Sequence, residues 1–166
     1  MAVNDHVLTQ KQLHDLLSYD PSEGIFRWKI TRPGLARVGS IAGTKNREGY
    51  IQIKVNAKMH GAHRLAWFYV HGEWPILLID HINGVSGDNR ICNLRLASPT
   101  ENAENQRRAK TGNSSGFLGV SKHYKGWRAI IGTNGKHIQL GTYKTPEEAH
   151  QVYLKAKREL HTGCTI

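Results

Sequence analysis

The chain has 166 residues, of which 39% are hydrophobic and 22% are charged, and this balance is typical of a globular protein. Its length suits one compact domain or two small ones. No apolar run approaches the roughly 20 residues of a membrane-spanning helix, and the first twenty residues lack the apolar core of a secretory signal. The sequence therefore predicts a cytoplasmic protein with no membrane partner.

Two further features restrict the kinds of site and partner. The only cysteines, Cys92 and Cys164, form no C-x-x-C pair, which excludes a disulfide framework or a cysteine-rich zinc site within this chain. We expect both to be buried thiols. The net charge is +10, and residues 107–166 hold 11 Lys and Arg against 3 acids, a net charge of +8. So basic a segment with interspersed aromatic residues predicts contact with a phosphate backbone, although a solvated basic face is the simpler alternative.

Helix and strand patterns alternate through the first seventy residues. Thr9 and Gln12 form a capping box before leucines at helical spacing, which predicts a helix over residues 9–19. Apolar and polar residues then alternate between turns that contain glycine, which predicts a small antiparallel sheet. The strands are expected at residues 25–30, 40–42 and 50–55, and the apolar run at 63–70 is expected to be helical in part.

A strand, a loop, a strand and a helix are expected between residues 76 and 110. The apolar residues 76–79 lead into Asp80, and 94–96 form a second apolar stretch. The helix start is marked by an N-cap, a proline and a capping-box glutamate, which are Ser98, Pro99 and Glu101. Asn102 and Asn105 then lie three residues apart on one helix face.

The polar stretch 111–116 has no apolar residue, and we interpret it as a linker between domains at 1–110 and 117–166. Beyond it, strand patterns occur at 119–122, 127–132 and 136–140, and Asn134-Gly135 predicts the second hairpin. Thr145, Pro146 and Glu148 mark the start of a last helix. Its apolar stripe is expected to pack on the three strands and comprises Ala149, Val152, Tyr153, Ala156 and Leu160.

The central segment resembles the HNH nuclease motif. The matching residues are Asp80-His81-Ile82-Asn83-Gly84, Asp88-Asn89-Arg90, Asn93-Leu94-Arg95 and Glu101-Asn102. In that family the unit is a ββα-metal fold, here expected at about 76–110, that hydrolyses DNA phosphodiesters. The upstream stretches 63–67 and 72–75 also look like phage HNH endonucleases. Taken singly, each piece is an ordinary turn or cap residue, and only their joint spacing carries the prediction.

The resemblance assigns a role to each motif residue. Asp80 and Asn102 would hold one Mg²⁺ or Mn²⁺ ion, since both offer the oxygen atoms that these ions prefer. His81, whose ordinary pKa is near 6.5, would accept a proton from the attacking water. Asn93 would fix the loop and orient His81, and Asn105 is an alternative ligand. His63 and Arg64 are within the upstream stretch and would either reach phosphate or pack in the core.

The C-terminal segment resembles an AP2 domain, in which a three-stranded sheet enters the DNA major groove. The matching stretches are residues 115–120, 127–131, 140–143 and 147–153. The residues expected to contact duplex DNA are Lys122, His123, Lys125, Arg128, Lys136 and His137. Trp127 should face the helix, because it alternates with Arg128. Leu118, Ser121 and Gln139 stand where plant AP2 domains present arginine, so their base code is not transferred.

The sequence thus predicts an α+β protein in which a small antiparallel sheet region supports an HNH nuclease core, followed by an AP2-like domain. The predicted function is metal-dependent cleavage or nicking of double-stranded DNA, with no small-molecule cofactor. The alternatives are a DNA-binding regulator with a relic nuclease motif and a protein that acts on RNA. Neither the oligomeric state nor the target sequence is indicated.

Overall fold

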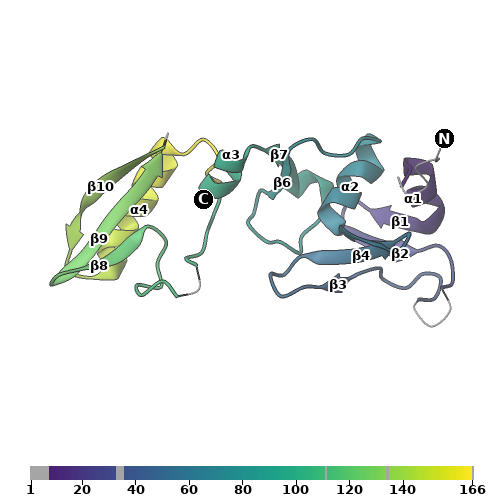
Figure 1. Ribbon diagram of the computed structural model, residues 1–166, viewed down its shortest axis with the longest axis horizontal. Helices are drawn as coiled ribbons and strands as arrows, with labels where there is room; N and C mark the ends of the chain where they lie inside the picture. The colour runs from purple at the N-terminus through teal and green to yellow at the C-terminus, as the bar shows by residue number, and fades with distance from the viewer. Residues whose placement is uncertain (1–7, 33–35, 111, 134, 166) are drawn as a thin grey trace, which may run out of the picture. The chain divides into compact units, whose positions relative to one another are not determined.

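The computed structural model describes residues 8–32, 36–110, 112–133 and 135–165 (Figure 1). The chain divides into two compact units, residues 1–96 and 97–166, and each is described here by itself. The predicted α+β class is confirmed, because small antiparallel sheets and a few helices make up the chain. Thr111 of the predicted linker and Asn134 of the predicted hairpin turn lie outside the described residues. None of the helices in the described parts has the length and apolar character that crossing a lipid bilayer requires.

The described residues of the first unit, 8–32 and 36–96, form three small sheets and two α-helices (Figure 1). Strand β1 pairs antiparallel with β2, β4 lies between β3 and β5, and β6 pairs with β7. The elements in chain order are α1 (Gln10–Leu16), β1 (Leu17–Asp20), β2 (Ile25–Trp28), β3 (Thr44–Lys45), β4 (Ile51–Val55), β5 (Lys58–Gly61), α2 (Ala62–His71), β6 (Leu78–His81), the 3₁₀ turn η1 (Ile91–Asn93) and β7 (Leu94–Ala97).

Two local predictions were wrong in this unit. The first helix ends at Leu16 rather than at residue 19, because Leu17 to Asp20 pair with β2 and Leu17 is fully buried. Residues 40–42 form no strand, and Ile41 makes a single bridge to Arg27. In both places the pairing of distant segments overrides the local pattern.

Cys92 is exposed and Cys164 is partly exposed, so the prediction of two buried thiols was also wrong.

One apolar core joins these elements. Leu13 of α1, Phe26 of β2 and Leu65 of α2 are almost fully buried within it. Ile79 of β6 and Leu94 of β7 belong to the same core. The polar loop between β6 and β7 is therefore anchored at both ends, because each of these strands has an apolar side chain in the core.

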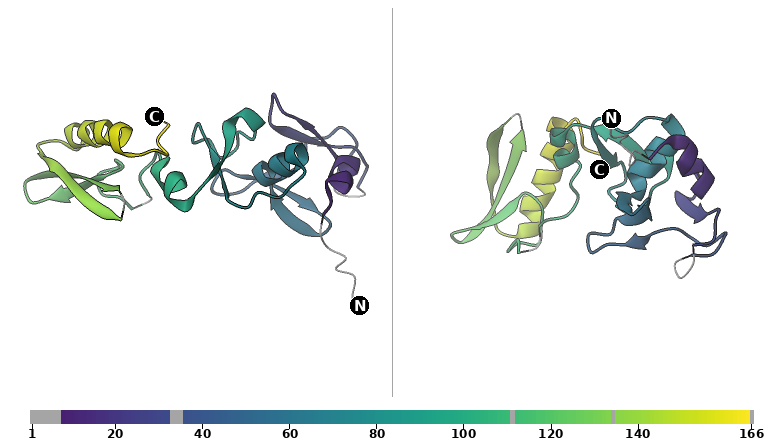
Figure 2. Two further views of the ribbon diagram at one scale, coloured as in Figure 1. Left: turned by 90° about the horizontal axis from the view of Figure 1, so that it is seen from above. Right: turned by 45° about the vertical axis from the view of Figure 1, so that its right-hand side comes forward.

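The second unit is built on a three-stranded antiparallel sheet with the order β10-β9-β8. Its elements are α3 (Pro99–Glu104), β8 (Val120–His123), β9 (Gly126–Thr133), β10 (Lys136–Tyr143) and α4 (Pro146–Leu160). Helix α4 lies along one face of this sheet (Figures 1 and 2). Ala129 and Ile131 of β9 are buried with Tyr153 of α4, and Trp127 packs against them as predicted.

The predicted apolar stripe of α4 is confirmed at Ala149, Tyr153 and Ala156, which pack in the core together with Leu154, a residue outside the predicted stripe. Leu160 is 42% exposed, whereas Lys157 is 1% exposed and its ammonium donates a hydrogen bond to the carbonyl oxygen of Gln106. Burial lowers the pKa of Lys157. A long lysine whose charged end reaches a carbonyl can thus replace an apolar residue in a small core.

Helix α3 belongs to the second unit because the end of the chain packs against it. The carboxylate of Glu104 accepts a 2.9 Å hydrogen bond from the backbone of Gly163, and Arg107 donates to both the carbonyl and hydroxyl oxygens of Thr165. A side chain at Gly163 would lie 2.4 Å from the carbonyl oxygen of Glu101. The boundary drawn by contacts, between residues 96 and 97, therefore falls before the linker predicted at 111–116.

Candidate active site

His81 ends strand β6 and is 4% exposed. Its Nε2 atom lies 3.2 Å from the side-chain oxygen Oδ1 of Asn89. The orientation of that amide is set by its nitrogen, which donates to the carbonyl oxygen of Gly87 at 3.3 Å. Because Oδ1 is an acceptor, Nε2 of neutral His81 carries the proton, and the lone pair of the ring is on Nδ1.

The surroundings of His81 favour this neutral form. Burial lowers the pKa of His81, and this effect exceeds the opposing influence of the Asn89 hydrogen bond and of the carboxylates of Asp80 and Asp88. A neutral imidazole held by its N–H has the protonation state and the fixed tautomer that a general base requires.

Asp80, the residue before His81, forms an ion pair inside the protein. The guanidinium of Arg95 on β7 places Nη2 2.8 Å and Nε 2.9 Å from Oδ2 of Asp80. The Asp80 side chain is 8% exposed and that of Arg95 is 29% exposed. Arg95 belongs to the motif, but its ion pair with Asp80 was not predicted. The pairing of β6 with β7 brings the two residues together across 15 positions of sequence.

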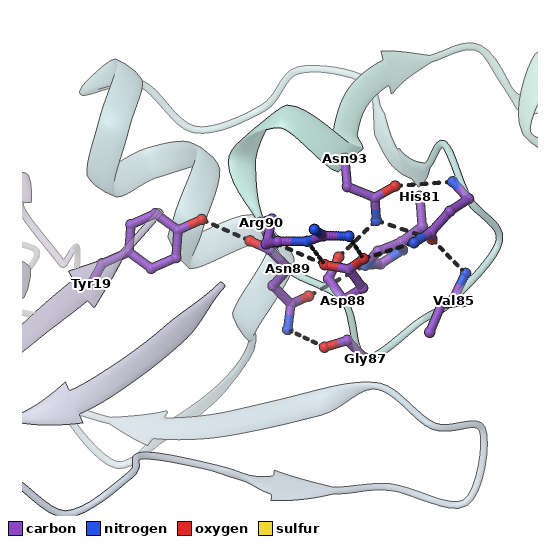
Figure 3. A network of polar contacts seen from close by, with 9 residues as sticks. Tyr19, His81, Val85, Gly87, Asp88, Asn89, Arg90 and Asn93 are labelled. Carbon is purple, nitrogen blue, oxygen red and sulfur yellow. Dashed lines mark hydrogen bonds and ion pairs between the residues drawn. The ribbon is translucent and has the colours of Figure 1, made fainter. Parts of the chain in front are cut away.

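The loop after His81 is held by a network of side-chain amides (Figure 3). Oδ1 of Asn93 accepts from the backbone of Asn83 at 2.9 Å, and Nδ2 of Asn93 donates to the carbonyl oxygen of Asp88 at 2.8 Å. Asn93 therefore ties the two ends of the loop together. The amide that bonds the His81 ring belongs to Asn89, which the sequence analysis quoted but gave no role.

Asp88 is the acidic centre of this network. Arg90 donates to both of its carboxylate oxygens, at 2.8 and 2.6 Å, and the amide of Asn83 donates to it at 2.7 Å. These hydrogen bonds, led by that of Arg90, lower the pKa of Asp88 to about 2. The carboxylate thus stays ionised at neutral pH and keeps the residues on either side of Asn89 in place.

The sheet formed by β1 and β2 also supports this loop. The hydroxyl of Tyr19 donates a 2.7 Å hydrogen bond to the carbonyl oxygen of Asn89 (Figure 3). Gly24, in the turn after β1, has a positive φ of 71°, and a side chain there would lie 2.3 Å from the backbone nitrogen of Arg90. The turn therefore needs glycine for two reasons: the positive φ, and the close approach of its backbone to that of Arg90.

The remaining motif amides lie in the second unit, on α3 and at its end. Asn102 is exposed in the first turn, where its backbone donates to the carbonyl oxygen of Ser98 at 3.0 Å. Asn105 is 4% exposed, and its side-chain oxygen accepts a hydrogen bond from the hydroxyl of Thr165. The exposed amide of Asn102 thus suits a metal ion better than the bonded oxygen of Asn105.

Two residues of the motif carry the oxygen atoms that a hard divalent ion prefers. Asp80 carries a buried carboxylate next to His81 in the first unit, and Asn102 carries an exposed side-chain amide in the second unit. Mg²⁺ keeps several of its waters and needs only one or two such protein ligands besides a phosphate. Across the described ranges, no group of three or more His, Cys, Asp and Glu side chains that could hold a metal ion is found.

Five of the six residues predicted to contact DNA are divided between the two faces of the second unit's sheet, and the sixth lies in a turn. Arg128 pairs with Ser121 on β8 and with Thr142 on β10, so it lies on the face turned away from α4. By the same alternation His123 and His137 share this face, whereas Lys122 and Lys136 share the face of Trp127. The ammonium of Lys122 lies 4.6 Å from the ring centre of Trp127, and Lys125 lies in the turn between β8 and β9.

Comparisons with known proteins identify the central segment. A family model described as HNH endonuclease matches residues 60–104. Protein 3.8 of Escherichia phage T7 is 34% identical over 102 residues, which cover 60% of this chain and 83% of that protein. A solved structure described as DNA binding and cleavage by the HNH homing endonuclease I-HmuI is 18% identical, with a TM-score of 0.42, and the match covers 89% of this chain and 88% of that one.

Proposed function

Because the chain belongs to the HNH endonuclease family, we propose that it is a metal-dependent enzyme that cuts or nicks double-stranded DNA by phosphodiester hydrolysis. The observation that carries this proposal is the state of His81, which is buried, neutral and bound at Nε2 by Asn89. A phosphodiester needs an activated water, and an imidazole with its lone pair on Nδ1 can take the proton of that water. The relative from a phage supports a site of action in the cytoplasm of a bacterial host.

Asp80 and Asn102 would hold the divalent ion, either Mg²⁺ or Mn²⁺. When bound, such an ion stabilises charge on the phosphoryl oxygens and on the leaving oxygen. The protein supplies the rest of the chemistry. His81 accepts the proton of the attacking water at Nδ1, Asn89 holds the ring by Nε2, and Asn93 holds the loop from which Asn89 projects.

The second unit would bind the duplex. Its segment from residue 107 onward carries 11 Lys and Arg against 3 acids, and phosphate contacts from such a surface supply most of the affinity for DNA. The three-stranded sheet backed by one helix agrees with an AP2-like domain, and we propose that its face turned away from α4 contacts DNA through Arg128, His123 and His137.

The decisive experiment compares the wild-type chain with His81→Ala on duplex DNA, with Mg²⁺ and with a chelator. Wild type should cut only with the metal. His81→Ala should cut about 10² to 10⁴ times more slowly, the range of a lost general base, while its Kd for DNA stays within about twofold. Wild-type rates in His81→Ala would contradict the mechanism. A wild type that binds DNA but never cuts it would point to a regulator, and preferential cutting of a matched RNA duplex would point to an RNA enzyme.

A further inference from the structure

Two aromatic rings from distant parts of the first unit, those of His63 and Tyr50, meet the ring of His81. The ring centre of His63, in the first turn of α2, lies 5.4 Å from that of His81, with the two planes at 67°. Tyr50, which precedes β4, lies 5.4 Å from His63 and 5.8 Å from His81. The imidazole of His81 is therefore contacted by two rings in addition to its hydrogen bond with Asn89.

His63 is held in this cluster at a cost. Its Nδ1 atom is buried and has no hydrogen-bond partner, an arrangement that usually calls for a specific explanation. Burial, with smaller contributions from His81 and Arg64, lowers the pKa of His63 to about 4, so this ring is neutral at pH 7. An apolar side chain of similar size would fill the space without leaving a polar atom unsatisfied.

The backbone beside His63 also makes room for its ring. A side chain at Gly61 would lie 2.6 Å from the Cε1 atom of His63 and 3.1 Å from its Nδ1 atom. The chain therefore comes close to the edge of the imidazole at the start of α2. Arg64, the next residue, points elsewhere and donates a 3.4 Å hydrogen bond to the carbonyl oxygen of Pro75.

We propose that His63, together with Tyr50, is a positioning residue that fixes the plane of the His81 ring. Rotation of an imidazole about its Cβ–Cγ bond changes the direction of the Nδ1 lone pair, so the plane of the His81 ring matters for a base that acts through Nδ1. A ring packed nearly perpendicular to His81 blocks this rotation. The inference rests on the proposed role of His81 as general base, for which the direction of the lone pair decides the rate.

The test uses the full chain with His63→Ala, which removes the ring, and His63→Phe, which keeps a ring without nitrogen atoms. His71→Ala is the matched control, since His71 ends the same helix and its ring centre lies 4.2 Å from that of Trp67. We expect His63→Ala to slow single-turnover cleavage by about 10- to 100-fold, the cost of a small misplacement, without changing the Kd for DNA. His63→Phe should recover a rate within roughly threefold of wild type, because packing fixes the plane.

Wild-type cleavage by His63→Ala would overturn the proposal. A His63→Phe variant as slow as His63→Ala would also overturn it, since a nitrogen atom would then be the essential feature. A readout independent of cleavage is the ¹H–¹⁵N spectrum of the His81 ring. We expect its signals to shift or broaden in His63→Ala and to remain unchanged in His71→Ala.

The ring spectrum also separates this inference from the proposed function. If wild type never cuts DNA but the His81 signals respond to His63→Ala, the nuclease proposal fails and the positioning contact stands. If His63→Ala does not fold, Tyr50→Leu removes the other ring of the cluster, and it should broaden the His81 signals and slow cleavage in the same direction. Unchanged His81 signals in the folded variants would refute the positioning role.

Discussion

Tyr19 and Asn89 are joined by a 2.7 Å hydrogen bond that spans 70 residues of sequence, from the first strand to the loop after His81. The same Asn89 holds Nε2 of His81 with its side chain. The N-terminal sheet thus fixes the backbone of the residue that fixes the proposed base. Burial raises the pKa of Tyr19 to about 12, so its hydroxyl remains a donor throughout the neutral and mildly alkaline range.

Replacing Asn89 should change the pH dependence of cleavage in a defined direction. The hydrogen bond from Asn89 raises the pKa of His81, while burial lowers it more. Cleavage by wild type should therefore rise with pH through a midpoint below 6.5, the ordinary value for histidine. In Asn89→Ala this midpoint should move to lower pH, and the plateau rate should fall because the ring tautomer is no longer fixed. A midpoint that moves upward in the pH profile of kcat would contradict the assigned hydrogen bond.

The ion pair of Asp80 with Arg95 predicts a link between folding and metal binding. Arg95→Ala leaves the buried carboxylate of Asp80 without its guanidinium partner, and breaking such a pair costs about 3 to 5 kcal/mol when it is fully buried. We expect a lower Tm for Arg95→Ala, with a larger increase on addition of Mg²⁺ than in wild type, because the ion can replace the missing positive charge. Arg90→Ala, which disrupts the other arginine pair of the loop, is the control. Equal Mg²⁺-induced shifts in Tm would argue against Asp80 as a ligand.

Acid should weaken the loop network through Asp88. The pKa of this carboxyl is lowered from 3.8 to about 2 in the folded chain, so its contribution to stability is complete above about pH 4 and is lost as pH falls toward 2. Urea unfolding of wild type should show this loss between pH 4 and 2. The loss should be smaller in Asp88→Asn, whereas Asp15→Asn, at an exposed pair with Lys11, should behave like wild type. Identical pH profiles for wild type and Asp88→Asn would rule out this contribution.

Local patterns predicted the elements whose signals are local. The capping boxes at Thr9, Ser98 and Thr145 mark the three helix starts as expected. The three antiparallel strands of the second unit were also predicted from local patterns. The alternation of apolar and polar residues along them correctly predicted that Trp127 faces the helix. These signals need only neighbours within a few residues, and so a single sequence can carry them.

The missed features depend on contacts between distant residues. The pairing of β1 with β2 shortens the first helix. Within the candidate site, the motif includes Asn89 and Arg95. Only the folded structure shows that Asn89 contacts His81 and that Arg95 pairs with Asp80. The burial of His63 against His81 likewise has no local signal.

We predict that one face of the second unit's sheet contacts DNA more closely than the other, and single substitutions on each face can test this. Removing residues 113–166 is a poor test, because it would strip α3 of its contacts with Gly163 and Thr165. Point changes keep the fold intact. Arg128 lies on the face turned away from α4, where its Nε atom is buried without a hydrogen-bond partner, and Lys122 lies over Trp127 on the other face.

If the face of Arg128 contacts the duplex, Arg128→Ala should weaken DNA binding and reduce the slope of log K against log salt by about 0.9, the value for one lost phosphate contact. Lys122→Ala should change that slope less, since its ammonium lies against an aromatic ring on the other side of the sheet. Lys155→Ala, on the exposed surface of α4, should leave the slope unchanged. Cleavage at saturating enzyme should persist in all three, because none of them alters His81 or Asp80. If Lys122→Ala weakens binding and lowers the slope more than Arg128→Ala does, the DNA lies on the opposite face of the sheet. If the slope is unchanged in all three variants, the basic residues of this unit form an ordinary solvated surface.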